Sequence, residues 1–177
     1  MQMNLKLKRT PGLYLAGFMA SGKTTAGRVL AAELGWQFAD IDQEIEREQG
    51  IPISRIFHER GESFFRDLET RVIRRHVMQV QSGMPRVIAL GGGALIQPKN
   101  WQALENNGIT IWLDCPLERI RQRLAGDNTR PLAADHQQLA RLFEERQPLY
   151  ARAHFRVEAD CDDANEIVSR ILQLPIF

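Results

Sequence analysis

Gly17-Phe18-Met19-Ala20-Ser21-Gly22-Lys23-Thr24 is the stretch that decides the fold of this chain. It matches the pattern G-x-x-x-x-G-K-[ST], the phosphate-binding loop (P-loop) of nucleotide-binding proteins. Residues 13–16 before it predict a buried strand, and residues 25–34 after it predict a helix that ends at Gly35. Glycines let successive backbone N–H groups converge on phosphate oxygens, and the helix adds the positive end of its dipole. The alternative is a glycine-rich turn that binds no ligand.

Two side chains of this loop carry chemistry of their own. In a P-loop the lysine reaches the β- and γ-phosphates of the nucleotide, and the hydroxyl of the next residue binds Mg²⁺. We therefore expect Lys23 and Thr24 to take these two roles.

Length and composition set limits on the rest of the protein. The chain has 177 residues, close to the commonest domain size, and a net charge of +1, so nothing indicates a basic surface for nucleic acid. Residues 1–9 are too short and too polar for a signal peptide, and no apolar run approaches the ~20 residues of a membrane span. Cys115 and Cys161 indicate reduced thiols rather than a disulfide framework. We expect one cytoplasmic domain, residues 1–177, that binds neither nucleic acid nor a membrane.

Strand-like and helix-like segments alternate along the chain. The predicted strands cover residues 13–16, 37–39, 86–90, 109–113 and 155–158. The predicted helices cover residues 25–34, 41–49, 53–60, 62–81, 98–106, 116–124, 135–150 and 163–172. This order predicts an α/β fold with three α/β/α layers around a central parallel sheet, and ligands at the carboxyl ends of its strands. The polar residues 125–134 predict a mobile lid.

Two acidic residues, Asp40 and Asp42, follow the second predicted strand. One carboxylate could orient an acceptor hydroxyl and take its proton, while the other holds water bound to a metal ion. The alternative is that Asp42 only caps the helix that follows.

Three glycines, Gly91-Gly92-Gly93, come directly after the third predicted strand. Because consecutive glycines cost conformational entropy, we expect that backbone N–H groups approach a ligand closely at this turn. A flexible turn without a ligand is the alternative.

Several arginines are candidates for binding anions. Arg66 stands three residues before Glu69, a spacing typical of a solvated ion pair. The aromatic residues before it, however, indicate a partly buried face, on which Arg66 could bind a substrate carboxylate. Arg130 lies in the predicted lid and could reach the charge that develops during phosphoryl transfer, or it could belong to an ordinary surface loop.

Two further arginines lie near helix ends. Arg146 could face the cleft from the end of a helix that we expect Pro148 to break, and Arg123 could stack on a base. No N-K-x-D sequence for reading guanine is present, which argues against a GTPase, and the short chain argues against a motor or helicase. A small-molecule kinase accounts best for these features.

The chain resembles the shikimate kinase family, a group of P-loop proteins similar to nucleoside monophosphate kinases. The resemblance extends from about residue 12 to the last helix, and its elements are GFMASGKTT, DID followed by QEIE, GESFFRDLE, GGG, RPL and RQPLY, in that order. One departure is Ala20, which stands where many family members have a further glycine. The resemblance implies transfer of the γ-phosphoryl group of ATP to the 3-hydroxyl of shikimate, with Mg²⁺, by a monomer.

The family's site residues can be assigned by position. The resemblance implies that the nucleotide is bound by Ala20, Ser21, Gly22, Lys23, Thr24, Thr25, Arg123 and Arg130. It implies that shikimate is bound by Asp42, Arg66, Gly91, Gly92, Gly93 and Arg146. Catalysis is assigned to Lys23, Asp42 and Arg130, and Mg²⁺ to Thr24 and, through water, Asp40. Two other hypotheses remain: a kinase for a related acceptor such as gluconate, and a nucleotide-binding regulator without catalytic activity.

Overall fold

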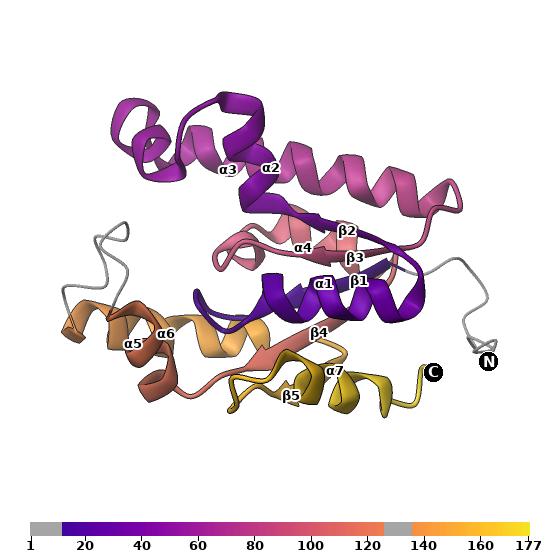
Figure 1. The fold of residues 1–177 in the computed structure, drawn as a ribbon. Coiled ribbons are helices and arrows are strands. Elements are labelled where there is room, and N and C mark those ends of the chain that lie inside the picture. Colours follow the sequence, from indigo (N-terminus) through magenta and orange to yellow (C-terminus); the bar gives the residue numbers. More distant parts are fainter. Residues whose placement is uncertain (1–11, 126–135) are drawn as a thin grey trace.

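A central sheet of five parallel strands, in the order β2-β3-β1-β4-β5, organises the chain (Figure 1). The structure, a computed structural model, describes residues 12–125 and 136–177. The strands are β1 (Gly12–Ala16), β2 (Gln37–Asp40), β3 (Arg86–Ala89), β4 (Ile109–Asp114) and β5 (Phe155–Glu158). The helices are α1 (Lys23–Leu34), α2 (Ile41–Gln49), α3 (Ile53–Gln81), η1 (Ala94–Ile96), α4 (Pro98–Glu105), α5 (Leu117–Leu124), α6 (His136–Tyr150) and α7 (Ala164–Leu172).

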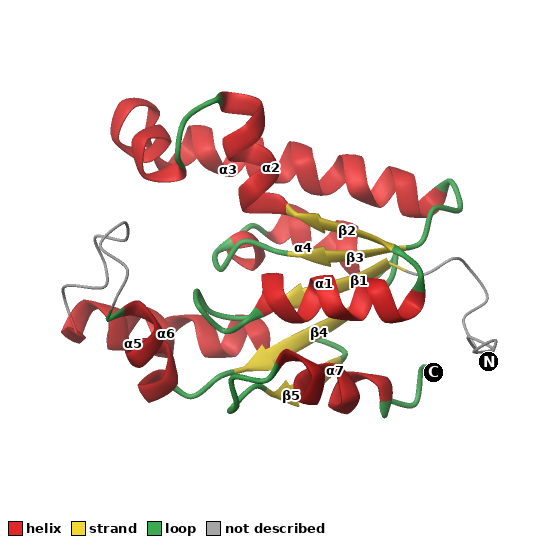
Figure 2. Cartoon of the chain, viewed as in Figure 1, coloured by secondary structure: helices red, strands yellow, loops and turns green. Residues whose placement is uncertain are grey.

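Helices cover both faces of this sheet, so the predicted α/β/α arrangement is confirmed. Helices α1 and α7 lie on one face, and α4, with α3 beside it, lies on the other (Figure 2). Strand β1 is buried along its whole length between β3 and β4, and places Leu13 beside Val87 and Ile109. Such strands are apolar without interruption because neither of their faces meets water.

Strand β1 lies in the middle of the sheet, and the order in which strands are added changes side there. From β1 the chain passes to β2 and β3 on one side of the sheet and then to β4 and β5 on the other. The loops after β1, β2 and β3 therefore open at the same edge, where open parallel sheets bind their ligands. These loops hold the P-loop, the acidic pair and the glycine turn, Gly91–Gly93.

Most predicted boundaries agree with the structure to within two residues. The break expected at Gly61 is present inside α3, where its φ of 82° and ψ of 170° are not helical. The short 3₁₀ helix η1 after the glycine turn was not predicted.

The local break predicted at Pro148 is absent, although the predicted end of this helix at residue 150 agrees with the structure. Helix α6 includes Pro148 and continues to Tyr150. A proline removes one N–H from the helical ladder, but the carbonyl of Gln147 still accepts from the N–H of Ala151 at 2.9 Å. The last turn of α6 therefore holds its shape and carries Tyr150 to the glycine turn.

The predicted lid cannot be compared with the structure, because Arg130 and the rest of the lid beyond Ala125 lie outside the described residues. Among the helices of residues 12–125 and 136–177, none combines the length and the apolar character needed to cross a bilayer.

Candidate active site

The P-loop, residues 17–24, joins β1 to α1 in a tight curl. Its backbone takes left-handed φ angles at Gly17 (143°), Ala20 (58°) and Gly22 (93°). A Cβ atom on Gly17 would lie 2.7 Å from the carbonyl oxygen of Leu113, so only glycine fits there. The curl ends at Gly22, the N-cap of α1, where the first N–H groups of the helix have no partner within the helix. This arrangement suits a phosphate group.

Ala20 is the one non-glycine residue with positive φ among the described residues. A left-handed conformation costs a residue with a Cβ about 1–2 kcal/mol, and a glycine would avoid this cost. Glycine also gives the unfolded chain more conformational freedom, which reduces the gain in stability by about 0.4–1 kcal/mol. We therefore expect Ala20→Gly to raise the free energy of unfolding by about 0.5–1 kcal/mol, measured by urea denaturation. The same change at the exposed, helical Ala32 should lower it by about 1 kcal/mol. Equal losses at both positions would contradict this account of Ala20.

Lys23 is held inside the curl of the P-loop by backbone carbonyl groups. Its Nζ donates hydrogen bonds to the carbonyl oxygens of Gly17, at 2.9 Å, and Phe18, at 2.7 Å, and the residue is only 9% exposed. Burial and these bonds keep the ammonium group beside the first turn of α1. A phosphate placed there would meet a fixed positive charge.

Thr24 and Asp40 join the P-loop to the end of β2. The Thr24 hydroxyl donates to Asp40 Oδ2 at 2.6 Å, and Asp40 Oδ1 accepts from the N–H of Gln43 at 3.1 Å, which makes Asp40 the N-cap of α2. The alternative in which Asp42 caps this helix is therefore wrong. Asp42 lies in the first turn of α2, is half-buried and lines a cavity.

The oxygen atoms of Thr24 and Asp40 fit a magnesium ion that is shared with a nucleotide. Mg²⁺ usually keeps several waters and takes one or two protein oxygens together with phosphate oxygens. Within residues 12–125 and 136–177 no group of three or more His, Cys, Asp or Glu side chains could enclose a metal ion. Thr24 and Asp40 could therefore supply one or two of the oxygen ligands of a magnesium ion.

At its first residue, Gly91, the glycine turn lies close to two carboxylate groups. A Cβ atom on Gly91 would lie 2.5 Å from Glu69 Oε1 and 2.8 Å from Asp42 Oδ1. A larger residue at Gly91 would force both carboxylates to move, and that of Glu69 is fully buried beside Arg66. These contacts are with side chains of the protein, so they leave open whether the turn also binds a ligand.

On its other side the turn meets two guanidinium groups. A Cβ atom on Gly93 would lie 2.5 Å from Arg66 Nη2 and 2.8 Å from Arg146 Nη1. The two cations, which come from α3 and α6, therefore lie within a few ångströms of each other. Burial and the neighbouring Arg66 charge lower the pKa of Arg146, so a bound anion would be favourable here.

Arg66 forms a buried ion pair and not the solvated pair that its spacing suggested. Its Nη1 donates to Glu69 Oε2 at 2.8 Å, and Glu69 is fully buried. Glu69 Oε1 has no hydrogen-bond partner among the described residues. Burial raises the pKa of Glu69 to about 7, although the Arg66 charge opposes the shift. Glu69 thus fixes Arg66 beside the turn and titrates near neutral pH.

We expect this carboxyl group to make stability depend on pH. Its pKa in the folded chain lies above the ordinary value of 4.5, so the stabilisation is full below pH 4.5 and is lost as pH rises through about 7. Relative to Glu69→Gln, the free energy of unfolding of the wild-type chain should fall by about 1–3 kcal/mol between pH 5 and pH 8. Glu62→Gln, at the exposed second partner of Arg66, should leave the wild-type slope intact. Parallel profiles for wild type and Glu69→Gln would refute this prediction.

Arg146 and Tyr150 reach the turn from successive turns of α6. Arg146 Nη1 donates to the carbonyl oxygen of Gly92 at 3.0 Å, and the Tyr150 hydroxyl donates to the same oxygen at 2.6 Å. The bond from Tyr150 depends on α6 continuing past Pro148, whereas Arg146 lies before the proline. Arg146 therefore lies against the glycine turn, whose Gly92 lines a cavity over the P-loop.

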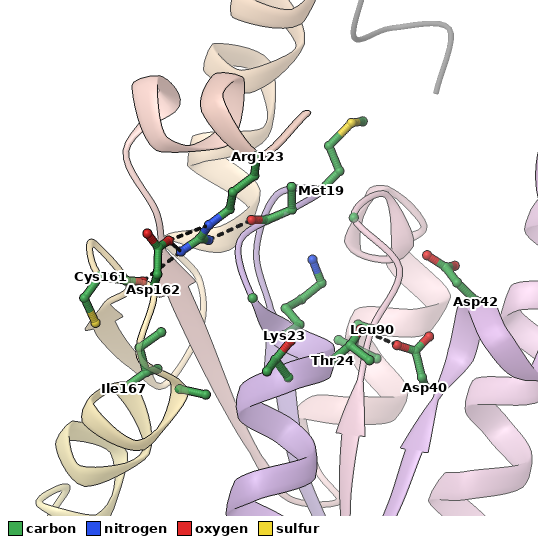
Figure 3. A pocket seen from close by; sticks show the side chains of 15 residues that line it. Met19, Lys23, Thr24, Asp40, Asp42, Leu90, Arg123, Cys161, Asp162 and Ile167 are labelled. Carbon is green, nitrogen blue, oxygen red and sulfur yellow. Dashed lines mark hydrogen bonds and ion pairs between the residues drawn. The ribbon is translucent and has the colours of Figure 1, made fainter. Parts of the chain in front are cut away.

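A cavity of about 320 Å³ lies over the P-loop (Figure 3). Lys23 and Thr24 lie at its centre, Asp40 and Asp42 at one end and Arg123 at the other. Its lining residues are Met19, Ala20, Gly22, Lys23, Thr24, Thr25, Asp40, Asp42, Leu90, Gly92, Arg123, Cys161, Asp162, Ala164 and Ile167. Ser21 is fully buried beneath it, and Arg66, Arg146, Gly91 and Gly93 adjoin it through the glycine turn. The structure thus brings the described candidate residues into one region.

Two residues of this region were missed from the sequence. Glu69 was named only as the ion-pair partner that its spacing from Arg66 suggests. No local sequence pattern shows that its side chain is buried in α3. Asp162 follows Cys161 in a loop for which no site was inferred, yet its carboxylate binds Arg123 across the cavity end. Both depend on contacts between distant segments.

Comparisons with known proteins agree with the geometry. A family model described as "Shikimate kinase" matches residues 19–175. A shikimate kinase of Persephonella marina is 44% identical over 161 residues, which are 90% of this chain and 96% of that protein.

Solved structures give the same result. The shikimate kinase of Acinetobacter baumannii in complex with shikimate is 41% identical, with a TM-score of 0.85 over 93% of this chain and 92% of that chain. The shikimate kinase of Aquifex aeolicus is 33% identical, with a TM-score of 0.79 over 91% of this chain and 94% of that chain.

Proposed function

We propose that this chain, which belongs to the shikimate kinase family, binds ATP over the P-loop and shikimate over the glycine turn. It is an ATP-dependent kinase that transfers the γ-phosphoryl group to the 3-hydroxyl of shikimate and releases ADP. The observation that carries the division into two subsites is the convergence of Arg66 and Arg146 on Gly93, beside the cavity that holds Lys23. Two guanidinium groups so close together suit the carboxylate of shikimate.

The acceptor subsite uses groups on three elements. Arg66 and Arg146 bind the carboxylate, and the backbone of the glycine turn contacts the ring hydroxyls. Asp42, which approaches Gly91 from α2, orients the 3-hydroxyl and takes its proton as the new bond to phosphorus forms. The bond between the γ-phosphorus and the bridging oxygen breaks, and that oxygen leaves with ADP.

The donor subsite supplies charge and position. The backbone N–H groups of residues 20–25 bind the phosphates. Lys23 gives up one of its hydrogen bonds to a loop carbonyl and binds the phosphoryl group that is transferred, whose negative charge is spread over three oxygens. Arg130, outside the described residues, remains our candidate for a lid arginine on the same phosphates. Positioning and charge stabilisation provide most of the catalysis in phosphoryl transfer.

We further propose that Mg²⁺ accompanies ATP. When bound, it would neutralise phosphate charge next to the hydroxyl of Thr24, with Asp40 holding its water shell. We also propose a monomer, which is the default for a compact kinase of this type, and ATP as co-substrate favours a cytoplasmic location.

Initial rates with different acceptors test the proposal. Shikimate should support release of ADP in a coupled assay, whereas gluconate, which is flexible and open-chain, should support almost none. The methyl ester of shikimate should show a KM raised at least about tenfold, since it lacks the charge that Arg66 and Arg146 bind. Equal use of gluconate would favour a related sugar-acid kinase, and ATP binding without transfer would favour a nucleotide-binding regulator.

A further inference from the structure

Arg123 has every one of its N–H groups bound by the protein. Its Nε donates to Asp162 Oδ1 at 3.2 Å, and its Nη2 donates to the same oxygen at 2.9 Å and to the Cys161 carbonyl at 2.7 Å. Its Nη1 donates to the Ala20 carbonyl at 2.8 Å and contacts Cys115 Sγ at 3.5 Å. An arginine has five such donors, all in the plane of the guanidinium. No donor is left for a phosphate, so only the flat faces of the group remain available.

The position of Arg123 suits stacking of its flat face on a planar ring. It lies at the end of the cavity away from Asp40 and Asp42, with the P-loop between them (Figure 3). The neighbouring lining side chains Ala164 and Ile167 are apolar. A planar ring is the kind of group that the face of a guanidinium and apolar side chains bind well.

Asp162 determines the orientation of this guanidinium. Besides two bonds from Arg123, its carboxylate accepts one from Arg119 Nη1 at 2.9 Å, and it thereby connects the loop before α7 to two successive turns of α5. The hydrogen bond from Arg123 lowers the pKa of Asp162, so the carboxylate is ionised at neutral pH. Arg123 in turn holds the carbonyl of Ala20, the strained residue of the P-loop.

We propose that Asp162 is a positioning residue for the nucleotide: it holds Arg123 flat, so that Arg123 stacks on the base and does not bind phosphate. The inference rests on the proposed function, because it takes the cavity to be the ATP site. Asp162 acts through Arg123 and does not touch the reacting atoms. The alternative is that Asp162 forms only a surface ion pair, since its side chain is 70% exposed.

Calorimetric titration with ADP tests this proposal. Asp162→Ala should weaken ADP binding about fivefold, because the Arg123 guanidinium loses the carboxylate that orients it. In an Arg123→Ala background, Asp162→Ala should have no further effect, since no guanidinium remains to be positioned. Binding of tripolyphosphate, which has no base, should change less than twofold. Asp160→Ala is the matched control, because Asp160 lies in the same loop but pairs with Arg170.

Three results would overturn the proposal. These are ADP binding by Asp162→Ala within twofold of wild type, an equal loss in both backgrounds, or an equal loss for tripolyphosphate. Kinetic assays on the same variants should show a raised KM for ATP with the KM for shikimate unchanged. Shikimate-dependent turnover of the wild-type chain is measured in parallel; if it is absent while ADP still binds, the proposed function fails and the role of Asp162 remains testable by titration.

Discussion

Lys23→Ala should lower kcat by at least about 100-fold, because the variant loses the fixed positive charge at the phosphate subsite. The buried ammonium group of Lys23 is already oriented by the carbonyls of Gly17 and Phe18, so the wild-type chain needs little rearrangement to meet a phosphate. Steady-state assays with saturating ATP and shikimate measure the effect. A loss in kcat, and not only in KM, is expected since charge builds up in the transition state.

The matched control for this prediction is Lys99→Ala. Lys99 is a half-buried lysine of α4 that pairs with Asp67 at 3.2 Å, and its removal should leave kcat within twofold of wild type. Because Lys23→Ala leaves loop carbonyls unpaired, its melting temperature should be measured beside its activity. A folded Lys23→Ala enzyme with near-normal kcat would remove Lys23 from its assigned role.

Arg146→Ala should raise the KM for shikimate about 10- to 100-fold, since a charged hydrogen bond to a carboxylate is worth about 1.5–3 kcal/mol. The KM for ATP should change far less, because Arg146 contacts the glycine turn and not the cavity around Lys23. Titration of both substrates in the coupled assay measures the two constants. Equal changes in both would place Arg146 outside the acceptor subsite.

Arg146 is a better target for this test than Arg66. Removal of Arg66 would leave the fully buried Glu69 without its cation, and breaking a buried pair in this way costs about 3–5 kcal/mol of stability. Arg146 donates to the backbone carbonyl of Gly92 and neutralises no buried carboxylate by a direct ion pair among the described residues, so the fold should tolerate the change. Arg141→Ala, at an exposed arginine of the same helix, is the matched control and should leave both KM values unchanged.

Local patterns in the sequence predicted most of the fold. Apolar runs such as residues 86–90 mark strands buried on both faces, and Gly35 ends α1 in a left-handed conformation, as its position indicated. The strand order in the sheet does not follow from such patterns. It results from pairings between distant segments, such as β1 with β3 and with β4.

The candidate site was only partly predictable, because its residues owe their arrangement to tertiary contacts. The three glycines predicted a close approach, but the groups that approach are side chains: Glu69 at Gly91 and Arg66 at Gly93. The Arg66–Glu69 spacing equally suits a surface pair, and only the burial of α3 decides between the two. The role of Asp162 depends on α5, to which no local signal connects it.

The account centres on one claim, that a phosphoryl donor at the P-loop meets a hydroxyl acceptor at the glycine turn. Phosphorus NMR of a reaction with ATP, Mg²⁺ and shikimate tests it most directly. We expect one new phosphomonoester, on the 3-hydroxyl of shikimate, formed in equal amount with ADP. Release of inorganic phosphate at the same rate with and without shikimate, and no phosphomonoester, would contradict it.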